Sequence, residues 1–178
     1  MSYYVRKSYP QPSPPEWNMW VHQNYGRTHC KVCLALDRRW FKKEKTPDWK
    51  HGSCHCVLED IPYFDVLTKC TSNSAYSKFD PYLFDVHGEY KHGKDKLFKA
   101  WGYTVEDTMF LKAEMEKQGV ENYVKGKYEL GKLNDNGQRV SIRIEIARKD
   151  TGEKVSFLTG WMVHPNGHIQ LITPYGGK

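Results

Sequence analysis

Residues 138–149 (QRVSIRIEIARK) and 153–164 (EKVSFLTGWMVH) do most to predict the fold. Apolar and polar residues alternate in both stretches, and this period of two is typical of strands with one buried face. Residues 128–133 and 168–173 continue the pattern on either side, and short links containing glycine join the four segments. Because such short links leave room only for antiparallel neighbours, we predict a four-stranded antiparallel sheet.

The alternation also predicts which side of this sheet is buried. One face is expected in the core and holds Val140, Ile142, Ile144, Ile146, Val155, Phe157, Thr159, Trp161 and Val163. This face is expected to pack on a helix over about residues 105–118, begun by a capping box of Thr104 and Asp107 and ended by Gly119. The opposite face is expected to meet solvent or a ligand and holds Ser141, Arg143, Glu145, Ser156 and His164.

Four of the five cysteines lie close together in the sequence. Cys30 and Cys33 form a C-x-x-C pair, and Cys54 and Cys56 form a C-x-C pair. Two such pairs can surround one tetrahedral ion, which predicts a structural zinc site. His51, three residues before Cys54, is an alternative fourth ligand because C-x-C needs a bent backbone to aim both sulfurs at one ion. The N-terminus does not resemble a signal peptide, so disulfides are not expected.

The composition permits some partners and disfavours others. The chain of 178 residues has a formal net charge of +6 and a pI near 9.0, which permits a nucleic-acid partner. No apolar run approaches the roughly 18 residues that would span a membrane, so no membrane contact is expected.

A dense basic run lies between the two cysteine pairs. It contains Arg38, Arg39, Lys42 and Lys43, together with Trp40. One interpretation is that these cations are solvated and offset the negative charge of a zinc–thiolate centre. The other is that they bind the phosphates of a nucleic acid while the indole stacks on its bases.

The cysteine-rich stretch resembles the zinc-binding tail of bacteriophage head-morphogenesis (minor capsid) proteins. That tail carries C-x-x-C, then Leu-Asp-Gly, then a proline followed by His-x-x-Cys-Arg-Cys. This sequence has Cys30, Cys33, Leu36-Asp37, Pro47 and His51-Gly-Ser-Cys54-His55-Cys56. The resemblance implies a small zinc-ribbon-like module and a virion setting. Arg38 stands where the tail has glycine, and His55 stands where it has arginine.

Residues 78–178 resemble an uncharacterised domain of bacteria and phages. The motifs that carry the resemblance are Tyr82-Leu83, His92-Gly93-Lys94, Gly131-Lys132-Leu133, Gly137-Gln138-Arg139-Val140, Gly160-Trp161-Met162-Val163, Pro165-Asn166-Gly167 and Thr173-Pro174-Tyr175-Gly176-Gly177. Such domains are similar to the toxin-like tips of secreted and phage-borne proteins. Their order of helices and strands is like that of small ribonucleases, which is an analogy of fold alone.

These observations divide the chain into four parts. Residues 1–26 are predicted to be an aromatic and proline-rich arm in which residues 16–25 form a short helix. A zinc-binding module (27–66) and a polar linker (67–77) precede an α+β domain (78–178). The predicted fold class is α+β: a small zinc-ribbon-like N-terminal module followed by helices packed on a four-stranded antiparallel sheet.

Six residues are candidates for metal-independent RNA cleavage, which needs a base, an acid and cations on the phosphate. They are His92, Lys94, Arg143, Glu145, His164 and His168. Lys94 lies in a glycine-flanked loop that could meet an anion, and His164 and His168 flank a turn across which they could approach each other. Each has an ordinary alternative as an exposed surface residue, so the sequence leaves open whether the protein is an enzyme.

Two functions from different classes follow. The first is a phage- or prophage-associated zinc-binding structural or interaction protein, related to the phage head or neck, whose partner is a phage structural protein. The second is a small ribonuclease or toxin-like effector whose zinc module binds nucleic acid or a partner, and which an immunity or inhibitor protein would neutralise. The expected location is the bacterial cytoplasm or the phage virion.

Overall fold

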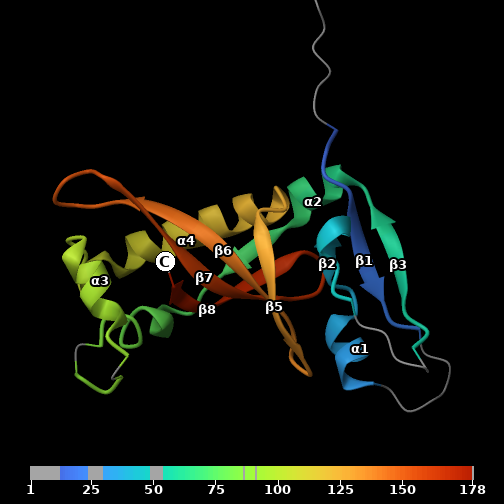
Figure 1. Ribbon diagram of the computed structural model, residues 1–178, viewed down its shortest axis with the longest axis horizontal. Helices are drawn as coiled ribbons and strands as arrows, with labels where there is room; N and C mark the ends of the chain where they lie inside the picture. Colours follow the sequence, from blue (N-terminus) through green and yellow to red (C-terminus); the bar gives the residue numbers. More distant parts are fainter. Residues whose placement is uncertain (1–12, 24–29, 49–53, 86, 91, 178) are drawn as a thin grey trace, which may run out of the picture.

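The computed structural model describes residues 13–23, 30–48, 54–85, 87–90 and 92–177 (Figure 1). Helices and strands are mixed along the chain, so the α+β class is confirmed. In order the elements are β1 (Trp17–Val21), α1 (Lys31–Leu36), β2 (Trp40–Lys42), β3 (Val57–Ile61), α2 (Tyr63–Lys69), β4 (Thr71–Asn73), α3 (Lys94–Ala100), α4 (Thr108–Val124), β5 (Tyr128–Asn134), β6 (Gly137–Ala147), β7 (Lys154–Val163) and β8 (His168–Gly177). Within these ranges, no helix is both long and apolar enough to cross a membrane.

The larger sheet has five strands within the described ranges, in the order β4-β8-β7-β6-β5. Strands β5 to β8 form the predicted antiparallel meander. The predicted number of four was wrong because β4 pairs parallel with β8, with Thr71 opposite His168. Strand β4 is three small polar residues within the stretch expected to be a linker, and pairing with β8 makes it a strand where its own sequence does not.

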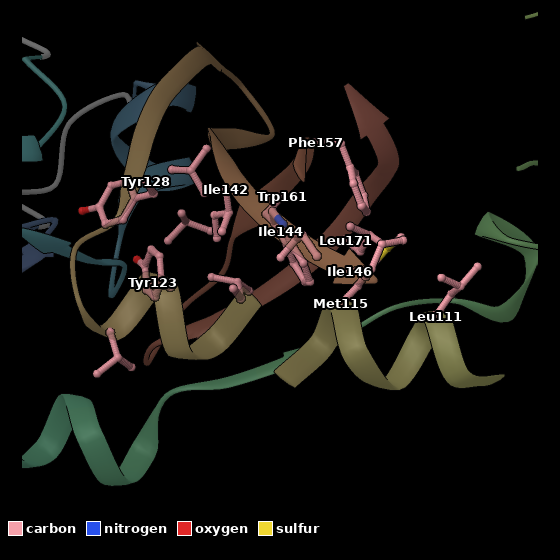
Figure 2. Close-up of a cluster of buried hydrophobic side chains, with 14 of the residues drawn as sticks. Leu111, Met115, Tyr123, Tyr128, Ile142, Ile144, Ile146, Phe157, Trp161 and Leu171 are labelled. Carbon is pink, nitrogen blue, oxygen red and sulfur yellow. The ribbon is translucent and has the colours of Figure 1, made fainter. Parts of the chain in front are cut away.

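Helix α4 covers one face of this sheet, and the central strands direct their apolar rows toward it (Figures 1 and 2). Its start carries the predicted capping box of Thr104 and Asp107. The buried rows of β6 and β7 also lie as predicted, with Val155 half-buried. The helix does not end at Gly119 but continues to Val124. The glycine instead permits close packing, because a Cβ there would lie 2.6 Å from the Trp161 ring.

The N-terminal part forms a separate sheet of three described strands in the order β2-β1-β3. Residues 17–21 are a strand and not the predicted helix. Trp17 and Trp20 are both buried although they lie on opposite faces of β1, because the strand is enclosed by neighbours. The zinc-ribbon layout is not matched either, since Cys33 lies in a short helix, α1, and Cys54 and Cys56 precede β3.

A single hydrophobic core joins the two sheets. The Trp17 and Tyr123 rings meet edge to face, with centroids 5.2 Å apart. The Tyr123 hydroxyl donates to the Trp40 carbonyl oxygen, and the Lys42 backbone N–H donates to the Tyr128 hydroxyl over 2.8 Å. These contacts fix β1 and β2 against the end of α4 and the start of β5.

Candidate functional site

Three cysteines gather beside the N-terminal sheet. The sulfurs of Cys33, Cys54 and Cys56 all lie within 4.8 Å of one another, and those of Cys33 and Cys54 are 3.7 Å apart. Cys30 precedes α1, and its side chain is hydrogen-bonded to that of Cys33. Three of the four cysteines predicted as ligands therefore come together, although Cys33 is separated from Cys54 by 21 positions, and Cys30 lies beside Cys33 at the start of α1.

Local structure explains how both pairs reach one place. Cys30 and Cys33 are three residues apart at the first turn of α1, a spacing that puts both side chains on one side of the helix. Cys54 and Cys56 lie before the start of β3, outside regular strand geometry. The backbone there is not held in the alternation that would aim the two sulfurs apart.

The chemistry of this cluster fits zinc. Tetrahedral zinc at about 2.3 Å from each sulfur places neighbouring sulfurs about 3.8 Å apart, close to the Cys33–Cys54 distance. Burial raises the pKa of the Cys33 thiol, and hydrogen bonds among the cysteines raise it further. Burial also raises the pKa of Cys56, against the opposing effect of the Trp20 indole N–H beside its sulfur. Such neutral thiols would lose their protons only to a metal ion.

A histidine that the sequence did not single out lies beside the cluster. The His22 ring nitrogen Nδ1 is 3.6 Å from the Cys56 sulfur, across 34 positions of sequence. No spacing rule could have identified it, because it follows β1 and not a cysteine. His51, the predicted alternative ligand, lies outside the described residues. Among the described residues, His22 is therefore an imidazole that the fold brings to the site from a distant part of the sequence.

The basic run is not arranged as predicted for nucleic-acid binding. Arg39 and Trp40 are buried, at 8% and 6% exposure, so neither side chain can reach a base or phosphate. Arg39 Nε donates to the Val163 carbonyl oxygen over 2.6 Å, which ties the N-terminal part to β7. Lys42 is paired with Glu44 at 2.8 Å, and Lys43 with Asp60 at 2.9 Å. Arg38 is exposed.

The candidate catalytic residues lie in three places. His164 and His168 approach each other across the β7–β8 turn, as predicted, with ring centroids 5.8 Å apart. His168 Nδ1 is 2.8 Å from Thr71 Oγ1, and His164 Nε2 is 3.0 Å from Gln170 Oε1. Burial lowers the pKa of His168, and the neighbouring His164 lowers it further.

Arg143 and Glu145 lie farther along the sheet, on the face away from α4. Arg143 donates to Ser156 Oγ over 3.2 Å, and Glu145 is paired with Lys154 at 2.9 Å. Arg143 is opposite Leu158, six residues from His164, which corresponds to about 20 Å along a strand. The structure therefore does not bring this pair to the histidines.

Lys94 lies in an open cleft of about 590 Å³ at the C-terminal end of β8. The residues that line it are Lys78, Tyr82, His92, Lys94, Arg139, Ile172, Thr173, Tyr175, Gly176 and Gly177. Lys94 Nζ donates to the Tyr82 hydroxyl over 2.9 Å and to Thr173 Oγ1 over 3.1 Å. The hydrogen bond from Lys94 lowers the pKa of Tyr82 more than burial raises it.

His92 holds two parts of this cleft in register. The Lys94 backbone N–H donates to His92 Nδ1 over 3.2 Å, so the ring proton is on Nε2. Nε2 then donates to the Tyr82 carbonyl oxygen over 2.7 Å. Both ring nitrogens are therefore engaged by the backbone, which makes His92 a positioning residue.

The cleft collects residues from motifs that are far apart in the sequence. Gly160 of β7 makes room for the Thr173 side chain, which lines the cleft, because a Cβ at position 160 would lie 2.8 Å from Thr173 Cγ2. Of the lining residues, His92 and Lys94 were among the predicted catalytic candidates. The signal that could have identified Tyr82, Arg139 and Thr173 is their presence in the motifs that carried the resemblance of residues 78–178.

Comparison with known proteins adds a family but no activity. No curated protein matches the chain, and no solved structure matches it. Residues 74–178 match a family described as a domain of unknown function, DUF6883. The match begins just after β4 and includes every residue that lines the cleft around Lys94, called the basic cleft below. The chain therefore belongs to the DUF6883 family.

Proposed function

We propose that this protein is a zinc-binding structural or interaction protein associated with a phage or prophage, related to the phage head or neck. The observation that carries the proposal is the convergence of the Cys33, Cys54 and Cys56 sulfurs within 4.8 Å, with Cys30 beside them. The phage setting rests on the resemblance of residues 27–57 to the zinc-binding tail of head-morphogenesis proteins.

The arrangement favours a structural over a catalytic metal. Four thiolates would complete a tetrahedral shell and leave no open position for water or substrate. Zinc, when bound, would cross-link the start of α1 to the segment before β3. Strand β1 pairs with β3, and the carbonyl oxygen of Trp20 in β1 accepts the Arg38 N–H over 2.8 Å. The cross-link would thus hold together elements that lie far apart in the sequence.

Zinc content tests this proposal directly. Purified wild type is expected to contain about one zinc per chain. Cys33→Ser and Cys54→Ser are expected to lose it, whereas Cys70→Ser, which changes a cysteine outside the cluster, is expected to retain it. Equal zinc content in all four proteins, or none in wild type, would contradict the proposal. Recovery of the tagged protein in purified phage particles tests the setting separately.

A ribonuclease or toxin-like effector is the second candidate. The observation that favours it is the position of Lys94, hydrogen-bonded to a tyrosine of lowered pKa in an open basic cleft. Incubation with total RNA, wild type beside Lys94→Ala, tests it. Cleavage by wild type alone supports an effector, for which an immunity protein covering the cleft would be the natural partner. Intact RNA in both samples leaves the first proposal as the function.

A further inference from the structure

The basic cleft has a charge pattern that the cysteine cluster does not explain. Three cations line it, Lys78, Lys94 and Arg139, and the described lining residues include no carboxylate. Within the described part of the chain, none of the three forms an ion pair. Their positive charge is therefore directed at the cleft without local compensation, which favours an anionic ligand.

The central cation is held in place by neutral groups. Lys94 Nζ is bonded to two hydroxyl oxygens, and it lies 5.0 Å from the centroid of the Tyr82 ring. The Tyr82 hydroxyl accepts from Lys94 and also interacts with the Thr173 side chain. Thr173 in turn donates to the Tyr175 carbonyl oxygen over 3.0 Å, which fixes its orientation. The ammonium is thus held in a fixed position by a network of hydroxyl groups.

Aromatic rings continue the cleft beyond its cations. The Tyr82 ring lies 5.4 Å from Tyr90 and 4.8 Å from His92, and the rings of Tyr90 and His92 stack at 6.0 Å. Tyr90 is 39% exposed, so its ring can accept a further planar partner. Cations that alternate with exposed aromatic rings are typical of grooves that bind single-stranded nucleic acid. A volume of about 590 Å³ also holds more than one phosphate group.

We propose that this cleft binds the backbone of a single-stranded nucleic acid, with Lys78, Lys94 and Arg139 on the phosphates and Tyr90 against a base. The inference goes beyond the zinc-binding function and does not require cleavage. It is also separate from the basic run at residues 38–43, where two of the five predicted contact residues are buried.

Fluorescence anisotropy with zinc-loaded full chain tests this inference. The probes are labelled oligonucleotides of about twelve nucleotides, one of DNA and one of 2′-O-methyl RNA, so that cleavage cannot disturb binding. Lys94→Gln and Arg139→Gln are expected to weaken binding about tenfold, and each is expected to lower the slope of log affinity against log salt by about one. Circular dichroism confirms that each variant is folded.

Two exposed lysines outside the cleft provide matched controls. Lys117 and Lys125 carry the same charge. Lys117 is exposed in the middle of α4, and Lys125 is exposed directly after its last residue. Lys117→Gln and Lys125→Gln are expected to change the affinity by less than about twofold. Equal loss in cleft and control variants would overturn the inference in favour of non-specific attraction, and so would the absence of wild-type binding.

Two further arms separate a nucleic-acid site from a site for small anions. Tyr90→Phe is expected to retain affinity and Tyr90→Ala to lose it, because stacking needs the ring and not the hydroxyl. Inorganic phosphate and a mononucleotide, matched to the oligonucleotide in phosphate concentration, are expected to compete poorly. Equal competition by either would overturn the inference and identify a small-anion site. Failure here would leave the zinc content unchanged, so the two proposals are tested independently.

Discussion

Gly119 of α4 packs closely against the Trp161 ring of β7. The Trp161 side chain is fully buried, and its indole N–H donates to Thr159 Oγ1 over 2.7 Å. The ring lies where a side chain at position 119 would stand. The sequence predicted Trp161 in the core, but it predicted Gly119 as a helix end because glycine usually has that role. Which role applies depends on the partner across the interface, and local sequence does not contain that partner.

Gly119→Ala is therefore expected to destabilise the protein by about 1 to 2 kcal/mol, although alanine favours a helix by about 1 kcal/mol. The added methyl must displace either α4 or the indole. Urea unfolding measures the change, with Lys117→Ala as a control on the exposed face of the same helix. In the Trp161→Phe background, where the ring is smaller, the cost of Gly119→Ala should fall. Stabilisation by Gly119→Ala in wild type would contradict the packing.

The His164–His168 pair predicts a pH dependence. The pKa of His168 is lower in the folded protein than its ordinary value of 6.5. As the pH falls below 6.5, the unfolded chain therefore binds a proton at this residue more readily than the folded protein does. Stability is therefore expected to be fully present above pH 6.5 and to fall as the pH drops through the folded pKa. His168→Gln should reduce this slope, measured as the difference from wild type in urea unfolding between about pH 8 and pH 5. A difference that is constant with pH would contradict the expectation.

Arg39 and Trp40 show where prediction from residue type fails. A cation beside an aromatic ring in a basic run is compatible with nucleic-acid binding, and the sequence cannot reveal that Arg39 donates to a carbonyl oxygen 124 positions away. The cleft was missed for the same reason, since Lys78 and Thr173 meet only through the fold. The clustering of the cysteines was predictable because the identity of cysteine and its short spacing carry most of the information.

At the scale of elements, the strand rows of β6 and β7 and the capping box of α4 were predictable because each is a local pattern. Strand β4 was not, because tertiary contacts and not propensity hold it. Ser72 Oγ donates to the Glu116 carbonyl oxygen over 2.6 Å, and Ser74 Oγ donates to Glu116 Oε1 over 2.7 Å. Glu116 of α4 also pairs with Lys112 at 2.5 Å. This carboxylate links the sheet edge to the helix.

Glu116→Gln is expected to cost about 1 kcal/mol near neutral pH. Burial would raise the pKa of Glu116, but the hydrogen bonds from Lys112 and Ser74 lower it below 4.5 overall. The carboxylate thus stabilises the fold above pH 4.5, and its contribution is lost as the pH falls through the folded pKa. Thermal unfolding should show a larger difference between wild type and variant at pH 7 than at about pH 3. Glu121→Gln, at an exposed α4 position, is the control.

At the scale of the whole molecule, the two sheets share one core, so a change at the cysteine cluster should alter the stability of both sheets. Trp17 of β1 and Tyr128 of β5 belong to the same buried cluster as Trp161 of β7. The four parts expected from the sequence follow shifts of composition along the chain. The core is formed by contacts between those parts. Tyr123 hydrogen-bonds to Trp40 across 83 positions, and Lys42 hydrogen-bonds to Tyr128 across 86 positions.

Removal of zinc by a chelator is expected to lower the melting temperature of the entire chain by about 10 °C or more. Tryptophan fluorescence and far-ultraviolet circular dichroism should report one coincident transition, with and without metal, because the sheets share their core. Readdition of zinc should restore the original melting temperature. Two separate transitions, with only the first sensitive to zinc, would show that the two sheets unfold independently.

The position of β8 between β4 and β7 has a consequence for biosynthesis. The ribosome makes β4 before α4 and the β5–β7 meander, yet its partner β8 follows them, and Thr71 precedes the paired His168 by 97 positions. The nascent chain can form α4 and the β5–β7 meander, but the edge of β7 stays uncovered until β8 emerges. The same strand supplies Thr173, which lines the basic cleft. A chain halted before residue 168 would therefore expose the unpaired backbone edge of β7, to which chaperones could bind. It would also lack part of the cleft, so any activity of the cleft begins only when translation has passed β8.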